Sequence, residues 1–210
     1  MRRSIVLSTI GVMLLGSYIF NAYIVSRPVT IQKVNDISVS GTDIIAFGDS
    51  LVAGIGATPG HDLVSDLSRE IGKPIVNLGH SGDTTADALA RVSELDKYHP
   101  GIVIVLLGGN DFLQKVPVDE SFANLAKIVE TVQKKRAEAL IVGLRVSPTR
   151  DNFDDAYQKL ADASHAAYVP DVLDGFYGDP AYMSDTLHPN DRGYAIMAAR
   201  IAPALKKLLR

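Results

Sequence analysis

Short apolar runs recur along the chain, and each is typical of a buried strand. They are IIAFG at 44–48, PIVNLG at 74–79, GIVIVLLGG at 101–109, ALIVGLRV at 139–146 and, more weakly, AAYVPDV at 166–172. Near-continuous apolar strands are what a parallel sheet covered on both faces requires. The pattern therefore predicts a mostly parallel, five-stranded sheet.

Between these runs, apolar residues recur at helical spacing. The predicted helices cover residues 61–71, 84–96, 119–136, 152–166 and 190–208. Thr84 and Asp87 resemble a capping box with Asp in place of the usual Glu or Gln. Pro203 interrupts the last helix and should kink it or end its regular part. Alternating strands and helices predict an α/β fold, a three-layer α/β/α sandwich.

A charge-free run from residue 4 to residue 26 follows Arg2 and Arg3. About 20 apolar residues span the hydrocarbon core of a bilayer as a helix. The arginine pair favours a cytoplasmic N-terminus with the remaining chain outside. We therefore predict an N-terminal transmembrane helix within residues 1–27, a linker at 28–42 and a folded domain at 43–210.

A cleaved signal peptide begins in the same way and is the alternative. Its apolar core is usually about 7–15 residues long and ends in small residues spaced A-x-A. Cleavage after Ala22 would place Phe20 at the upstream position, and cleavage after Ser26 would place Ile24 there. Both are too bulky, so we favour an uncleaved anchor. In either case the bulk of the chain is exported.

Composition excludes several classes of site. The chain has 21 Lys and Arg against 24 Asp and Glu, a net charge of −3, which argues against a nucleic-acid partner. Without the three arginines of residues 1–27, the remainder has 18 basic and 24 acidic residues and a net charge of −6. The absence of cysteine excludes disulfides, a thiol nucleophile and thiolate zinc sites.

Polar blocks follow the predicted strands, where ligands bind in open α/β sheets. GDSL (48–51), NLGHSGD (77–83) and GGND (108–111) each follow a strand, and DTLHPN (185–190) follows the last strand and a long loop. A serine hydroxyl becomes nucleophilic when a base accepts its proton and a third group orients the base. Ser50 is the candidate nucleophile, His188 the candidate base and Asp185 the orienting acid.

A tetrahedral oxyanion requires fixed hydrogen-bond donors. The backbone N–H groups of Ser50 and Gly82 and the side-chain amide of Asn110 are the candidates, from three different loops. Each block also has a purely structural explanation, because turns and helix caps favour glycine, asparagine, aspartate and serine. The joint order of the four blocks at strand ends favours the catalytic interpretation.

Other polar residues near the blocks are assigned by their surroundings. His80 is a rival base because it shares a loop with the Gly82 donor. Asp49 and Asp111 are expected to hydrogen-bond neighbouring loops, and Arg145 to bind an anionic group or pair with an aspartate. Six further apolar residues near the blocks are expected either to line a pocket or to pack in the core or a loop: Phe112, Leu113, Phe176, Tyr177, Tyr182 and Met183.

The four blocks together resemble those of the GDSL/SGNH hydrolase family, which read here GDSLVAG (48–54), NLGHSGDTT (77–85), LGGND (107–111) and DTLHPN (185–190). The resemblance covers about residues 43–205 and is greatest to the small bacterial thioesterase/lysophospholipase and arylesterase enzymes. It implies a flavodoxin-like SGNH fold. It also implies Ser50, Asp185 and His188 as the catalytic residues, with Ser50, Gly82 and Asn110 in the oxyanion hole.

The resemblance implies a serine ester hydrolase that forms an acyl-enzyme on Ser50, without a metal or cofactor. Its substrate would be a small-molecule acyl ester or a lipid-like molecule. An O-acyltransferase or deacetylase of envelope polysaccharide, or a catalytically silent envelope-binding module, is the alternative. We expect a periplasmic catalytic domain, anchored by the N-terminal helix or secreted after cleavage, and favour a monomer. The anchor departs from the usual subgroup members, which are periplasmic with a cleaved signal.

Overall fold

The computed structural model describes residues 39–145 and 153–210. In chain order the elements are β1 (Asp43–Gly48), α2 (Ser50–Ala53), α3 (Leu63–Ile71), β2 (Val76–Gly79), α4 (Thr85–Ala90), the 3-10 helix η1 (Val92–Lys97), β3 (Pro100–Leu106), α5 (Gly109–Leu113), α6 (Val118–Lys134), β4 (Glu138–Val142), α7 (Phe153–Ser164), β5 (Ala167–Val169) and α8 (Asp191–Leu208). None of these helices has the length and apolar character needed to cross a bilayer. The predicted transmembrane helix lies outside the described residues.

The five strands form one parallel sheet in the order β2-β1-β3-β4-β5. The first strand, β1, pairs with β2 on one side and with β3 on the other. Its last residue, Gly48, lies opposite Gly79 of β2 and opposite Leu106 of β3. The chain order therefore reverses between β1 and β3. The carboxyl ends of strands at such a switch point are where α/β folds of this kind bind ligands.

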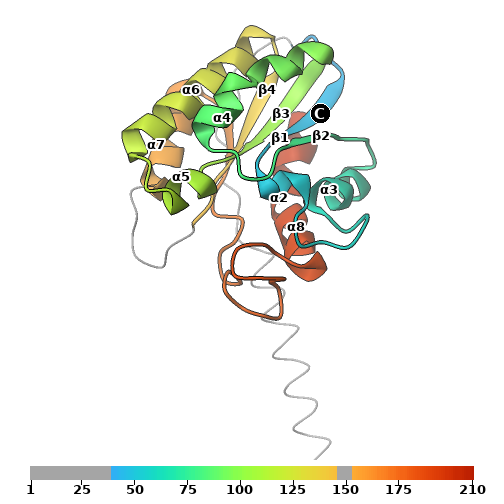
Figure 1. The fold of residues 1–210 in the computed structure, drawn as a ribbon. Helices are drawn as coiled ribbons and strands as arrows, with labels where there is room; N and C mark the ends of the chain where they lie inside the picture. The colour runs from blue at the N-terminus through green and yellow to red at the C-terminus, as the bar shows by residue number, and fades with distance from the viewer. Residues whose placement is uncertain (1–38, 146–152) are drawn as a thin grey trace, which may run out of the picture.

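Helices cover both faces of the sheet (Figure 1). One face packs against α2, α3 and α8, and the other packs against α4, α6 and α7. Side chains alternate along β1: Ile44 and Ala46 belong to the first core, and Ile45 and Phe47 to the second. Because both faces are buried, the strands are apolar throughout. The predicted α/β/α arrangement with a five-stranded parallel sheet is confirmed for these residues.

The structure differs from the predicted helices in three places. The helix predicted for 84–96 is divided at Arg91 into α4 and the 3-10 helix η1. The last helix runs through Pro203 to Leu208, so the proline does not end it. Two short helices, α2 and α5, follow β1 and β3 directly and were not predicted. They are too short for an apolar period, and both begin within the polar blocks.

Candidate active site

The segment that carries Ser50 is a tight turn from β1 into α2. Gly48 is required because a Cβ there would lie 2.3 Å from the carbonyl oxygen of Leu106 on β3. Asp49 caps the helix, and its carboxylate accepts the Leu51 N–H at 3.0 Å. Ser50 is thus the first residue of α2, and the N–H groups of a first helical turn have no partner within the helix. Its hydroxyl and its backbone N–H are therefore presented together at the end of the strand.

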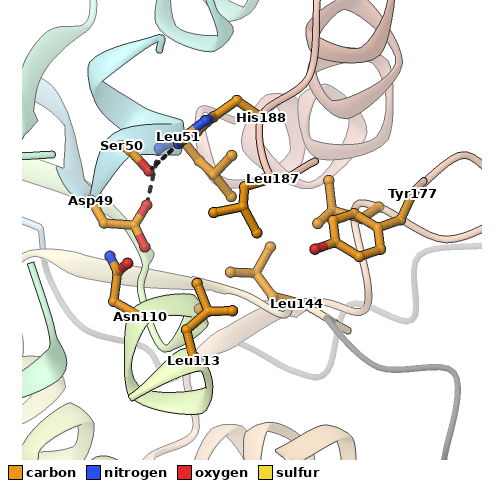
Figure 2. A pocket seen from close by; sticks show the side chains of 11 residues that line it. Asp49, Ser50, Leu51, Asn110, Leu113, Leu144, Tyr177, Leu187 and His188 are labelled. Atoms are coloured by element: carbon orange, nitrogen blue, oxygen red, sulfur yellow. Dashed lines mark hydrogen bonds between the residues drawn. The ribbon is translucent and has the colours of Figure 1, made fainter. Parts of the chain in front are cut away.

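The side chains of Ser50, His188 and Asp185 form a chain of hydrogen bonds. His188 Nε2 lies 3.1 Å from Ser50 Oγ, and His188 Nδ1 lies 2.8 Å from Asp185 Oδ2. Figure 2 shows His188 directed at the serine hydroxyl. The other oxygen of Asp185 accepts the backbone N–H groups of Leu187 and His188, each at 2.7 Å. The structure therefore brings the three predicted residues together.

These contacts determine the charge of the acid. The hydrogen bond to His188, followed by the two backbone N–H groups, lowers the pKa of Asp185 to about 2. The Asp185 carboxylate is therefore ionised at neutral pH and accepts a hydrogen bond from an N–H at His188 Nδ1. This favours the imidazole tautomer whose free nitrogen, Nε2, faces the Ser50 hydroxyl and can accept its proton.

The loop that carries Asp185 and His188 is packed against the tract after the Ser50 helix. Gly56 has a φ of +94°, and a Cβ there would lie 2.3 Å from Ser184 Oγ and 2.6 Å from the Pro189 carbonyl oxygen. Thr58 donates its N–H and its hydroxyl to the two carboxylate oxygens of Asp191, each at 2.7 Å. Residues 56–58 thus contact both the loop that carries Asp185 and His188 and the first residue of α8.

The two other predicted oxyanion donors occupy adjoining loops. Asn110 lies in α5 and lines the pocket beside Ser50. Its side-chain amide donates a hydrogen bond of 2.9 Å to the Asp83 carbonyl, which uses one of its two amide hydrogens. Gly82 precedes Asp83, has a φ of +90°, and lies outside the pocket lining. The structure thus places Asn110 at the serine and Gly82 in the loop that Asn110 contacts.

Asp111 and Asp49 are buried and make different contacts. Asp111 accepts the N–H of Thr85 at 2.8 Å and its hydroxyl at 2.5 Å, which joins α5 to α4 as expected of a residue that bonds a neighbouring loop. Asp49 caps its own helix instead. Burial raises the pKa of Asp49 to about 7. The rival base His80 is 51% exposed, its Nε2 lies 3.8 Å from Glu94, and it is not among the residues that line the pocket beside Ser50.

The pocket beside Ser50 has one polar side and one apolar side (Figure 2). Asp49, Ser50, Asn110 and His188 form the polar side. The apolar lining residues are Leu51, Leu113, Leu144, Leu173, Tyr177 and Leu187. Such a lining suits the apolar part of an ester placed with its carbonyl at the serine.

Sequence reasoning identified this lining in part. Of the six residues named from the sequence, Leu113 and Tyr177 line the pocket. Phe176, Tyr182 and Met183 are buried in one core, and Phe112 packs against the other. The missed lining residues are Leu51, Leu144, Leu173 and Leu187. Leu51 and Leu187 lie inside polar blocks, Leu144 in a predicted strand and Leu173 in the long loop after the last strand, so no shared local pattern marks them.

Charged groups away from the pocket pair with one another. The Arg145 guanidinium donates to Asp154, with Nε at 2.6 Å, which agrees with its predicted pairing with an aspartate. Within residues 39–145 and 153–210, no group of three or more His, Cys, Asp or Glu side chains is placed to hold a metal ion.

Residues 46–196 match the GDSL-like Lipase/Acylhydrolase family. The chain belongs to this family. An arylesterase of Vibrio mimicus is 31% identical over 184 residues, which cover 82% of this chain and 92% of the relative. The thioesterase 1/protease 1/lysophospholipase L1 of Escherichia coli K12 is 30% identical over 79% of this chain and 84% of the relative. The crystal structure of TesA superposes with a TM-score of 0.75 at 28% identity, over 80% of this chain and 99% of that one.

Family membership makes this protein an ester-bond hydrolase. The family match begins in β1 and ends within α8, so it spans the strand ends that carry the four blocks. One residue near the site had no sequence signal. Arg91, at the junction of α4 and η1, contacts the ends of β1 and β2. A lone arginine on a predicted amphipathic helix is usually a solvated surface residue, so spacing did not distinguish it.

Proposed function

We propose that this GDSL-family hydrolase cleaves small acyl esters through an acyl-enzyme on Ser50. His188 is the general base and acid, and Asp185 orients it. The observation that carries the proposal is the continuous relay from Ser50 Oγ to His188 Nε2, at 3.1 Å, and from His188 Nδ1 to Asp185, at 2.8 Å. A base within hydrogen-bond reach of a hydroxyl and oriented by a carboxylate is the arrangement that activates a serine.

The reaction has two half-reactions. Ser50 Oγ attacks the ester carbonyl carbon while His188 Nε2 takes the hydroxyl proton. Donors at Ser50, Gly82 and Asn110 stabilise the oxyanion. Collapse of the tetrahedral intermediate breaks the ester bond, and the alcohol leaves with the proton from His188. A water molecule then loses a proton to His188 and attacks the acyl group, and release of the acid returns the proton to Ser50.

Small apolar acyl or aryl esters are the substrates that the pocket suits best. Leucine side chains and Tyr177 line it beside the serine. The relatives named arylesterase and thioesterase support a broad acyl specificity. We also propose that residues 1–27 anchor the enzyme in the membrane with residues 43–210 as a periplasmic catalytic domain, which the arginine pair before a charge-free run supports.

The nucleophile is tested by Ser50→Ala, with Ser93→Ala as a control at an exposed serine of η1. The wild type and the control should hydrolyse p-nitrophenyl acetate and incorporate a fluorophosphonate probe at one serine. The Ser50→Ala variant should lose at least about 1,000-fold in kcat, because triad members act as a unit, and should not be labelled. Wild-type hydrolysis by folded Ser50→Ala protein would refute the proposal.

A further inference from the structure

Arg91 is nearly enclosed among the segments that form the active site. Its side chain is 13% exposed. One terminal nitrogen donates to the carbonyl oxygen of Gly48 at 2.8 Å, and the other donates to that of Leu78 at 3.1 Å. The guanidinium also lies over the ring of Phe47, 4.4 Å from its centroid. The arginine therefore joins the carboxyl ends of β1 and β2, and Gly48 is two residues before Ser50.

Besides its bond to Glu94 at 3.3 Å, Arg91 contacts the loop that carries Gly82 and Asp83. Its Nε donates to the carboxylate of Asp83 at 2.5 Å, and both side chains are largely buried. The backbone carbonyl of Asp83 accepts the side-chain amide of Asn110 at 2.9 Å. The Arg91 guanidinium thus connects β1, which leads to Ser50, with Asp83. Asp83 in turn directly follows Gly82 and accepts the hydrogen bond from Asn110.

We infer that Arg91 is a positioning residue that holds the oxyanion donors Gly82 and Asn110 in register with Ser50. The inference rests on the proposed function, since it assigns Arg91 to the same oxyanion hole. A guanidinium suits this task because its donors form a rigid, planar fork, whereas a lysine ammonium is a point charge on a flexible stem. Misplacing reacting groups by about 1 Å is enough to cost about 100-fold in rate.

The test is Arg91→Lys, which keeps the charge and loses the fork. Active sites are counted by fluorophosphonate incorporation taken to completion. The kcat per active site for p-nitrophenyl acetate should fall about 10- to 100-fold, with KM within about two-fold, because the donors act on the transition state. The matched control is Arg69→Lys, which alters an exposed arginine paired with Asp66 and should leave kcat unchanged. An Arg91→Lys kcat equal to that of this control would overturn the inference.

A second variant separates positioning from folding. Asp83→Asn keeps the carbonyl that accepts Asn110 and removes the charged partner of Arg91. It should lower kcat per active site in the same direction as Arg91→Lys. If both variants lose the cooperative thermal transition, Arg91 acts through stability and the inference is overturned.

Combination with Asn110→Ala distinguishes failure of the inference from failure of the oxyanion assignment. If Arg91 acts through Asn110 and its loop, the double variant Arg91→Lys, Asn110→Ala should lose less kcat than the product of the single losses. If the kcat loss of the double variant equals the product of the single losses, the inference is overturned while the oxyanion role of Asn110 stands. The same conclusion follows if Arg91→Lys has a normal kcat and Asn110→Ala a lowered one. An unimpaired Asn110→Ala would remove Asn110 from the oxyanion hole and the inference with it.

Discussion

Asn110 places a side-chain amide at the edge of the pocket, with one hydrogen committed to Asp83. The second hydrogen is the one proposed to meet the oxyanion. Asn110→Ala should lower kcat for p-nitrophenyl acetate by about 100- to 1,000-fold, as loss of one such donor does elsewhere. The control is Gln114→Ala, which removes an exposed amide just after the same helix. Steady-state kinetics measure the effect, and a kcat within two-fold of the control would exclude the role.

Asp49 makes stability depend on pH, because burial raises its pKa from 3.8 to about 7. Between these values the folded protein holds a proton that the unfolded chain releases, so the free energy of unfolding falls as pH rises from about 4 to about 7. Asn keeps the acceptor for the Leu51 N–H but does not ionise. Relative to the wild type, Asp49→Asn should therefore gain stability as pH rises over this window, by about 4 kcal/mol at most at 1.36 kcal/mol per unit.

Urea unfolding at intervals between pH 4 and pH 8 measures this difference. The control is Asp87→Asn, because hydrogen bonds from the Thr84 side chain and backbone lower the pKa of Asp87. That carboxylate stabilises the protein above its unfolded pKa, and the stabilisation is lost as pH falls. Almost all of this change lies below pH 4, so the control should stay nearly parallel to the wild type between pH 4 and pH 8. Parallel curves for Asp49→Asn and wild type would contradict the prediction.

At the residue scale, the sequence identified every side chain of the proposed relay. Asp185 and His188 are three residues apart, which is a local relation, and Ser50 follows a recognisable strand. Arg91 was missed because its four hydrogen-bond acceptors lie on several segments. Three of these acceptors lie at the end of β1, in β2 and in the loop after β2, and nothing in the local sequence marks them.

Among the elements, α8 is unusual because it continues through Pro203. A proline inside a helix has no N–H for the carbonyl four residues earlier, here that of Ala199, and its ring crowds that carbonyl. Pro203 is exposed, so replacing it removes few contacts. Pro203→Ala should therefore raise the free energy of unfolding by about 1–3 kcal/mol. Chemical denaturation measures the gain.

The control for this helix is Lys207→Ala, one turn later and also exposed. It should change stability by less than about 0.5 kcal/mol, as surface substitutions usually do. A Pro203→Ala variant no more stable than this control would show that the helix accommodates the proline without a net cost.

The sequence predicted the long elements better than the short ones. Each apolar run overlaps an observed strand, and the capping box at Thr84 and Asp87 is present. The division of the helix after Ala90 was not predicted, since the apolar spacing continues across it. Arg91 has φ −108° and ψ 11°, outside the helical range, at the residue whose side chain bonds the strand ends. A tertiary contact thus coincides with the break in local periodicity.

For the whole molecule, the N-terminal run and the acidic remainder lead to one prediction. The full chain should sediment with membranes and stay there in high salt, because an apolar helix and not charge attraction would hold it. A chain lacking residues 1–27 should be soluble and still hydrolyse p-nitrophenyl acetate. Fractionation with an activity assay measures both. Recovery of the full-length gene product in the soluble periplasmic fraction, shortened near residue 22 or 26, would favour the signal-peptide alternative.

The sequence by itself determined the features that neighbouring residues carry: the apolar strands, the helices between them, the four polar blocks and the family that they resemble. Local spacing suffices there, because strand and helix periods are properties of short segments. Only the tertiary structure decided which segments meet. It brings Ser50 within 3.1 Å of an imidazole 138 residues away and groups the apolar wall of the pocket. It also gathers the acceptors of Arg91, since these relations depend on the strand order and on packing across loops.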